Sequence, residues 1–195
     1  MVQVNRIVNN FISMSLKDII FRRKSPSVKS KQTGPLEAEM VPVRGYFEII
    51  HLRGGSVLSR QQVNNTVPYV GKYAVANNLI FSSLPRMAYM ALGSDSTAAA
   101  VGQSILLGEL TGAASSGAAR VQASVSAVNV SAPTGITDTA QFYNSFAIQV
   151  SCQIQEVAIF NLSGANNGQM MGRQVVTAIN GQNGDTVVVT YKFQF

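Results

Sequence analysis

The sequence of 195 residues has no tryptophan, one cysteine, one histidine and few charged side chains. A single cysteine, Cys152, cannot form an internal disulfide, and Cys152 with His51 cannot supply the four ligands of a structural zinc site. No apolar run approaches the roughly 18 residues that a transmembrane helix needs. The sequence therefore indicates neither a disulfide scaffold, nor a zinc-stabilised domain, nor a helical membrane protein.

Charged residues make up 12% of the chain, about half the usual share, whereas the hydrophobic share of 46% is ordinary. Uncharged polar side chains take their place, with 14 Asn, 14 Gln, 20 Ser and 10 Thr. Such a chain is too apolar and too weakly charged to be disordered throughout. Its surface relies little on charge for solubility, which suits contact with other protein.

The net charge of +6 lies at one end of the chain. Residues 1–31 contain seven basic residues and one acidic residue, whereas residues 32–195 contain eight of each. We therefore predict two parts, a basic N-terminal arm with its linker over residues 1–35 and a neutral body over residues 36–195.

The arm has the apolar spacing of an amphipathic helix over residues 2–24, followed by a linker rich in serine, proline and glycine over residues 25–35. The favoured interpretation is a helix that docks on its own body or on a neighbouring protein. A membrane-surface anchor and a nucleic-acid-binding arm are the less favoured alternatives. The expected partner-binding residues are an apolar set and a basic set: Val4, Ile7, Val8, Phe11, Arg22, Arg23 and Lys24.

The body has apolar residues that alternate with a period of two, which is typical of strands. Turn sequences separate these segments, at Arg53-Gly54-Gly55 and at residues 180–185 for example. One helix is expected over residues 67–82, with Pro68 in its first turn. We predict a mainly β fold, an antiparallel β-sandwich or jelly-roll-like domain with one helix and a basic N-terminal helical arm. The strands expected after the helix cover residues 87–92, 120–130, 142–150, 152–160, 170–179 and 187–195.

Motifs for catalysis or metal binding are lacking. His51 lies between apolar strand residues, and Cys152 is interpreted as a buried, inert thiol. The acidic residues of the body stand singly, without the spacing of an acid–base pair. Asn166, Asn167 and Asp185 are interpreted as turn residues before calcium ligands. We therefore predict that the protein is not an enzyme and has no catalytic, cofactor-binding or metal-binding residues and no cofactor.

Several short motifs follow one another in residues 89–195. They are Ala91-Leu92-Gly93, Leu107-Gly108-Glu109-Leu110, Arg120-Val121, Glu156-Val157-Ala158-Ile159-Phe160, Gly168-Gln169-Met170-Met171-Gly172-Arg173 and Gly184-Asp185. Their order resembles a module common in virion proteins of tailed bacteriophages, including tail-collar, fibre-attachment and head-decoration proteins. The resemblance implies a structural protein located in the virion, beside capsid, portal, neck or tail components.

Four charged residues of these motifs are expected to form structural ion pairs, which fix register even where they add little stability. The expected pairing joins Glu156 to Arg120 or Arg173, at a sheet edge or between strands. The fourth residue of the set is Glu109. Because the strand edges lack lysine guards, we also predict homo-oligomeric packing, in which neighbouring copies cover those edges.

Three other functions compete with that of a phage virion protein. The first is a jelly-roll coat protein of an icosahedral virus, whose basic arm binds nucleic acid; the arm carries less charge than this function favours. The second is a β protein attached to a membrane surface by residues 1–24. The third is a carbohydrate-binding sandwich, which the lack of tryptophan disfavours.

Overall fold

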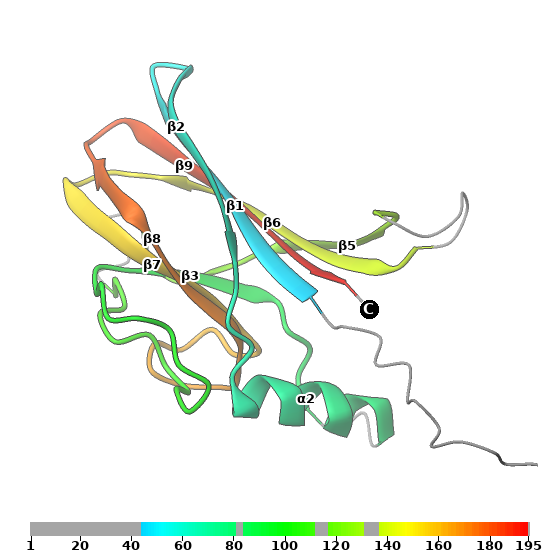
Figure 1. Ribbon diagram of the computed structural model, residues 1–195. Coiled ribbons are helices and arrows are strands. Elements are labelled where there is room, and N and C mark those ends of the chain that lie inside the picture. The colour runs from blue at the N-terminus through cyan, green and yellow to red at the C-terminus, as the bar shows by residue number, and fades with distance from the viewer. Residues whose placement is uncertain (1–43, 81–83, 112–116, 131–136, 195) are drawn as a thin grey trace, which may run out of the picture. The chain divides into compact units, whose positions relative to one another are not determined.

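The computed structural model describes residues 44–80, 84–111, 117–130 and 137–194, all of them in the compact unit Met40–Phe195. They form two antiparallel sheets packed together and one short helix (Figure 1). The predicted mainly β, antiparallel sandwich is thus confirmed. The predicted arm and linker, residues 1–35, lie outside the described residues.

The larger sheet has five strands in the order β2-β1-β9-β6-β5. Its centre is β9 (Asp185–Gln194), which pairs on one side with β1 (Arg44–Arg53) and on the other with β6 (Thr139–Ala147). One edge is β2 (Ser56–Asn64) and the other is β5 (Ser124–Val128). The first and the last strand of the described chain therefore lie side by side.

The turn between β1 and β2 falls where the sequence predicts it. Gly54 and Gly55 have φ angles of 54° and 82°, a backbone conformation that glycine adopts at little cost. This turn fixes the register of β1 against β2. Alternate residues of β1 point to the same face, and Phe47, Ile49 and His51 on that face are buried.

The smaller sheet has four strands in the order β4-β3-β7-β8. Its strands are β3 (Tyr89–Gly93), β4 (Val121–Gln122), β7 (Cys152–Phe160) and β8 (Met170–Gly181). β7 is one of the two inner strands, and its second half, from Glu156 to Phe160, is buried at every position, as expected for a segment covered on both faces.

The strand expected over residues 120–130 is divided between the two sheets. Val121 and Gln122 pair with β3 in the smaller sheet, whereas Ser124–Val128 pairs with β6 in the larger one. The change occurs at Ala123, whose N–H donates to the carbonyl of Ala88 at 2.7 Å. The prediction of one strand was wrong because alternation reports which side chains share a face and not which sheet they join.

The single helix of the described chain, α2 (Tyr69–Ile80), lies at one end of the sandwich and packs on β8. It begins two residues after the expected start, and Pro68 precedes the helix, where its carbonyl accepts from the N–H groups of Gly71 and Lys72. Gly71 is essential to this packing because a Cβ there would lie 2.7 Å from the carbonyl oxygen of Met171. Residues 81 and 82 of the expected helix lie outside the described residues.

The core fills the space between the sheets. Its centre is an aromatic group in which Tyr191 contacts the rings of Phe47, Phe142 and Phe193 at centroid distances of 4.5, 5.8 and 6.4 Å. The Tyr191 hydroxyl accepts a hydrogen bond from Asn65 at 3.1 Å, which satisfies its buried oxygen.

None of the described helices is of a length and apolarity that would let it span a membrane.

Candidate functional site

A buried ion pair joins β7 to β8. The Arg173 guanidinium donates to Glu156 at 2.8 Å from Nε and stands 2.7 Å from the same oxygen through Nη2. Both side chains are 1% exposed or less. Within a β-sandwich such charges are tolerated only when the surrounding groups complete their hydrogen bonding.

The loop of residues 94–108 supplies those hydrogen bonds. Arg173 also donates to the Gln103 side chain at 2.9 Å and to the Thr97 carbonyl at 3.0 Å. Glu156 accepts from the backbone N–H of Gly108 at 2.7 Å. The ion pair therefore holds a long loop of small residues against the sheet, a loop that has no strand or helix of its own.

Gly93 makes room for this arrangement at the end of β3. A Cβ on Gly93 would overlap the Glu156 carboxylate, with the Glu156 Cγ only 2.6 Å away. The small residue that ends the Ala91-Leu92-Gly93 motif is thus matched to the acid on the neighbouring strand.

A second buried ion pair joins Glu109 to Arg120. The guanidinium meets both carboxylate oxygens at 2.8 Å, and the two side chains are 1% and 2% exposed. The Arg120 guanidinium also lies over the Phe160 ring, 3.6 Å from its centroid, a cation–π contact. Its remaining hydrogen bonds go to the carbonyls of Leu162 and Asn167 at 2.9 and 2.8 Å, so this pair holds the loop after β7.

The structure thus places all four expected ion-pair residues inside the body. Glu156 pairs with Arg173, one of the two partners considered for it. Arg120, the other, pairs with Glu109 instead. The alternative of a Glu156–Arg120 pair does not occur because Arg120 lies over Phe160, at the opposite end of the β3–β7 pairing from Glu156.

A third charged cluster surrounds Asp185 and was missed from the sequence. Arg53 donates to both of its carboxylate oxygens at 2.7 and 2.9 Å, and the His51 ring lies 2.8 Å away. The N–H of Gln182 donates to the same carboxylate at 2.9 Å. The hydrogen bond from Arg53, followed by those from Gln182 and His51, holds the pKa of Asp185 well below its ordinary value.

The position of this cluster follows from strand pairing. Arg53 is the direct partner of Asp185 in the β1–β9 ladder, and each residue adjoins a glycine turn. From the sequence, Asp185 is interpreted as a turn residue, and His51 is only placed between apolar strand residues. Only knowledge that the first strand pairs with the last would have joined them.

The His51–Asp185 contact is made through the Nε2 atom of the ring, whereas in a catalytic triad the acid contacts Nδ1 and Nε2 faces the nucleophile. No serine, threonine or cysteine among the described residues hydrogen-bonds to the His51 ring. Cys152 is half-buried rather than buried, and desolvation raises the pKa of its thiol, which disfavours the reactive thiolate. In the described part of the chain no three His, Cys, Asp or Glu side chains are grouped as metal ligands would be.

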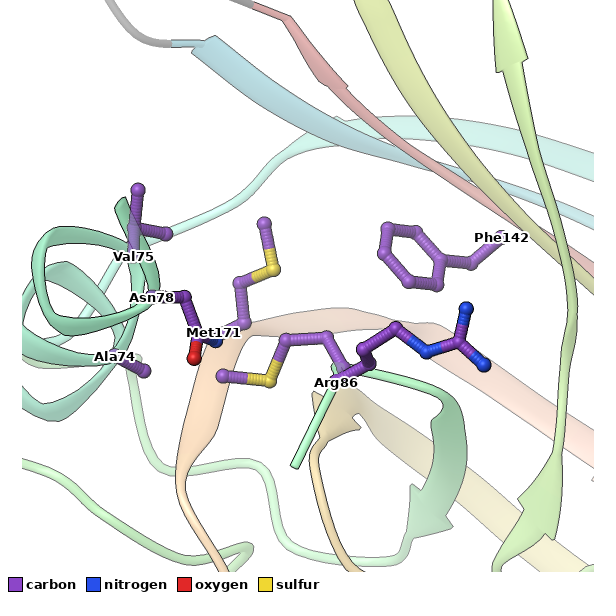
Figure 2. Close-up of a pocket in the computed structure, with 7 residues that line it drawn as sticks. Ala74, Val75, Asn78, Arg86, Phe142 and Met171 are labelled. Carbon is purple, nitrogen blue, oxygen red and sulfur yellow. The ribbon is translucent and has the colours of Figure 1, made fainter. Parts of the chain in front are cut away.

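A small pocket lies between α2 and the end of the sandwich (Figure 2). Its volume is about 270 Å³, and its lining is mostly apolar. The Oδ1 atom of Asn78 is buried without a hydrogen-bond partner, and the Arg86 side chain extends toward Phe142. The residues around it are Ala74, Val75, Asn78, Arg86, Met87, Phe142 and Met171. No carboxylate, hydroxyl or thiol stands among these described residues.

The two flanks of the sandwich, where the edges of the two sheets meet, differ in how they are closed. At the β2–β8 flank, the Gln61 amide donates to the Thr177 carbonyl at 2.9 Å and accepts from the Thr177 N–H at 2.8 Å. At the β5–β4 flank, Val125 is 53% exposed and Val121 is 37% exposed. In the described part of the chain no strand pairs with the outer side of β5.

Comparison of the chain with protein-family models, with curated proteins and with solved structures finds no match.

Proposed function

We propose that this chain is a non-enzymatic structural protein of a bacteriophage virion. In this proposal the N-terminal arm attaches the body to the head, neck or tail, as a decoration, collar or fibre-base protein does. The body packs beside further copies of itself and beside capsid, portal or tail components. A virion location follows from the same proposal.

One observation carries the proposal. The charged residues of the motifs that resemble phage virion proteins meet in two buried ion pairs, Glu109–Arg120 and Glu156–Arg173. Residues that are scattered over the sequence thus serve one structural purpose, the attachment of long loops to a sandwich. Charges that are hydrogen-bonded in this way are not available as acids, bases or ligands for a substrate.

The composition of the surface supports the same proposal. Large apolar side chains such as Val57, Leu58 and Tyr69 are 50% exposed or more, while the body carries no net charge. Exposed apolar side chains and few charges favour burial against other protein in an assembly.

The arm is proposed as the attachment element. Val4, Ile7, Val8 and Phe11 would bind a groove on a capsid or portal protein, at the spacing of a helix-in-groove contact. Arg22, Arg23 and Lys24 would then meet an acidic surface and speed the encounter more than they strengthen binding.

Purified phage particles test the proposal. Mass spectrometry of particles should find the full chain at a fixed copy number, and deletion of residues 1–33 should remove it from them. The shortened body should keep its far-ultraviolet circular dichroism, which shows that it folds. A full chain that is absent from particles, or a folded shortened chain that still joins them at full copy number, would contradict the proposal.

The alternative with support in the sequence is a jelly-roll coat protein whose basic arm binds nucleic acid. Its support is the basic character of residues 1–31, with seven basic residues, although this is less charge than such an arm favours. Binding of the full chain to nucleic acid, with an affinity that falls steeply with salt, would favour this alternative. Replacement of Arg22, Arg23 and Lys24 by glutamine should then reduce the salt dependence. Membrane attachment is tested in the same way by flotation with anionic vesicles.

A further inference from the structure

The two flanks of the sandwich, the β2–β8 flank and the β5–β4 flank, differ in their readiness to accept another strand. Gln61 occupies the backbone groups of Thr177 at the β2–β8 flank and so ties the two sheet edges together. At the β5–β4 flank the chain passes from one sheet to the other at Ala123 and leaves the outer side of β5 without a strand in the described part of the chain. An exposed strand edge is a template for pairing with another chain unless it is guarded.

β5 has none of the usual guards. Its five residues, Ser124-Val125-Ser126-Ala127-Val128, include no charged residue and no proline. All but Val128 are exposed, and the strand contains no glycine bulge. By contrast β2, the other edge of the same sheet, carries the exposed Arg60, whose guanidinium lies 3.6 Å from Glu48.

The pairing of β5 with β6 shows which side chains face the core. Val125 stands opposite Phe142, which is buried, and Ala127 stands opposite Ala140. Ser124 and Ser126 stand opposite Tyr143 and Gln141 and so belong to the outer face. The core-facing side of β5 is therefore apolar, and its outer side carries the two serines together with Val128, which stands opposite Thr139.

Two β5 strands in antiparallel orientation would place complementary side chains opposite each other. In an antiparallel pair of two β5 strands centred on Ser126, each Val125 would stand beside Ala127 of the other copy, on the core side. Each Val128 would stand beside Ser124 of the other copy, and the two Ser126 side chains would meet on the outer face. Every large side chain is thus opposite a small one. A two-fold axis would place any charged residue near the axis opposite the same charge of the other copy, and β5 has no charged residue.

We propose that β5 is the strand by which two copies of this chain pair, antiparallel, about a two-fold axis at Ser126. The pairing joins the two five-stranded sheets edge to edge through backbone hydrogen bonds, a β-augmentation. It names the interface of the homo-oligomer that forms part of the proposed function, but it needs no virion for its test.

A hollow beneath β5 fits this arrangement. It has a volume of about 230 Å³ and lies on the core side of the flank. Its lining residues are Arg86, Met87, Ala88, Gln122, Ala123 and Val125. A strand added beyond β5 continues the larger sheet over this hollow, so its core-facing side chains would cover a lining that is partly polar, with Arg86 and Gln122, and partly apolar, with Met87, Ala123 and Val125.

Sedimentation of the full chain is the first test. The wild-type chain should form dimers or larger even-numbered oligomers. Ser126→Lys should weaken the association constant by at least about tenfold, because the two lysines face each other at the axis. Gln62→Lys, on the exposed part of β2, adds the same charge to the other edge and should leave the oligomer unchanged. Circular dichroism checks that both variants fold.

A cross-link tests the register. In a Cys152→Ser background, Ser126→Cys should form an intermolecular disulfide under mild oxidation, since directly opposed residues of an antiparallel pair lie within disulfide reach. Ser56→Cys, on the other edge strand, is the matched control and should remain a thiol.

Several outcomes would overturn the proposal. They are a wild-type monomer at all concentrations, an odd-numbered oligomer, an oligomer that Ser126→Lys leaves intact, and equal cross-linking of the two cysteines. Loss of Ser126→Lys from phage particles with unchanged self-association would instead assign β5 to a strand of another protein. The chain's absence from particles would remove the virion proposal while leaving the β5 pairing standing.

Discussion

The apolar inside of the body holds several charged side chains, and its outside carries several large apolar ones. Glu156, Arg173 and Asp185 are 1% exposed or less, whereas Val57, Val125 and Tyr69 are 53% exposed or more. In most proteins charged side chains cover the surface and apolar ones gather inside. Here the buried charges hold loops and turns to the sheets, and the exposed apolar residues leave a surface suited to contact. A few buried charges can thus hold the loops of a sandwich in place, while its weakly charged surface is suited to contact with other protein chains.

The largest expected effect comes from breaking a buried ion pair. Glu156→Leu leaves the Arg173 guanidinium buried without its carboxylate, and we expect a loss of about 3–5 kcal/mol in the free energy of unfolding. Urea unfolding measures it. Glu48→Gln is the control, because the exposed Glu48–Arg60 pair should contribute less than about 1 kcal/mol. Equal effects of the two substitutions would show that the buried ion pair contributes no more to the free energy of unfolding than the exposed one.

The contact of α2 with the sandwich can be broken at one atom. Gly71→Ala places a methyl group 2.7–2.8 Å from the carbonyl oxygens of Met171 and Met170, and backbone cannot move aside as a side chain can. We expect a loss of about 1–3 kcal/mol in the same unfolding experiment. Gly102→Ala, where no atom lies within 4 Å of the added carbon, should be nearly neutral. A neutral Gly71→Ala would show that α2 does not pack on β8.

The Asp185 cluster should make stability depend on acidity. Because the folded-state pKa of Asp185 lies below that of the unfolded chain, its contribution is complete above about pH 4 and is lost as the pH falls below that value. Urea midpoints between about pH 6 and pH 2.5 measure this loss. Asp185→Asn should lower the midpoint at pH 6 and flatten the acid dependence. An unchanged acid dependence in Asp185→Asn would contradict the assignment.

The smallest effect is expected at the open flank. Ser126→Lys alters an exposed position, so under conditions where both chains are monomeric its free energy of unfolding should stay within about 0.5 kcal/mol of the wild-type value. The same change should alter oligomer size. If β5 is a contact surface, Ser126→Lys should change the oligomer size without changing the stability of the monomer. A large loss of stability would instead show that the exposed face of β5 contributes to the stability of the fold.

The sequence predicts the strands well because burial on one face leaves an alternating pattern. β7 begins and ends at the predicted residues 152 and 160, and the glycine turns at residues 54 and 55 lie where expected. β6 runs from Thr139 to Ala147 instead of over residues 142–150, since its first residues, Thr139, Ala140 and Gln141, carry no alternating apolar signal.

The candidate site residues were harder to place, because partners far apart in sequence leave no periodic trace. The choice of Arg173 or Arg120 for Glu156 depends on the neighbours of β7, and these follow from the sheet order. Arg53 and Asp185 meet across 132 positions of the chain. Residue types alone could indicate that rare charges of the body serve in ion pairs, but the sheet order decides which ones meet.

The central place of β9 bears on the order of events during synthesis. The strand completes the five-stranded sheet between β1 and β6, yet it is the last described strand to leave the ribosome. Until residues 185–194 emerge, β1 and β6 have no common partner strand. The Phe47 and Phe142 rings then lack their contacts with the Tyr191 ring. Two of the four strand pairings of this sheet thus wait until β9 has been made, and the β1–β9 pairing must still close a loop of more than a hundred residues. Nascent chains cut short before Asp185 would therefore present open strand edges to one another, and the cell's chaperones would meet this protein chiefly in that interval.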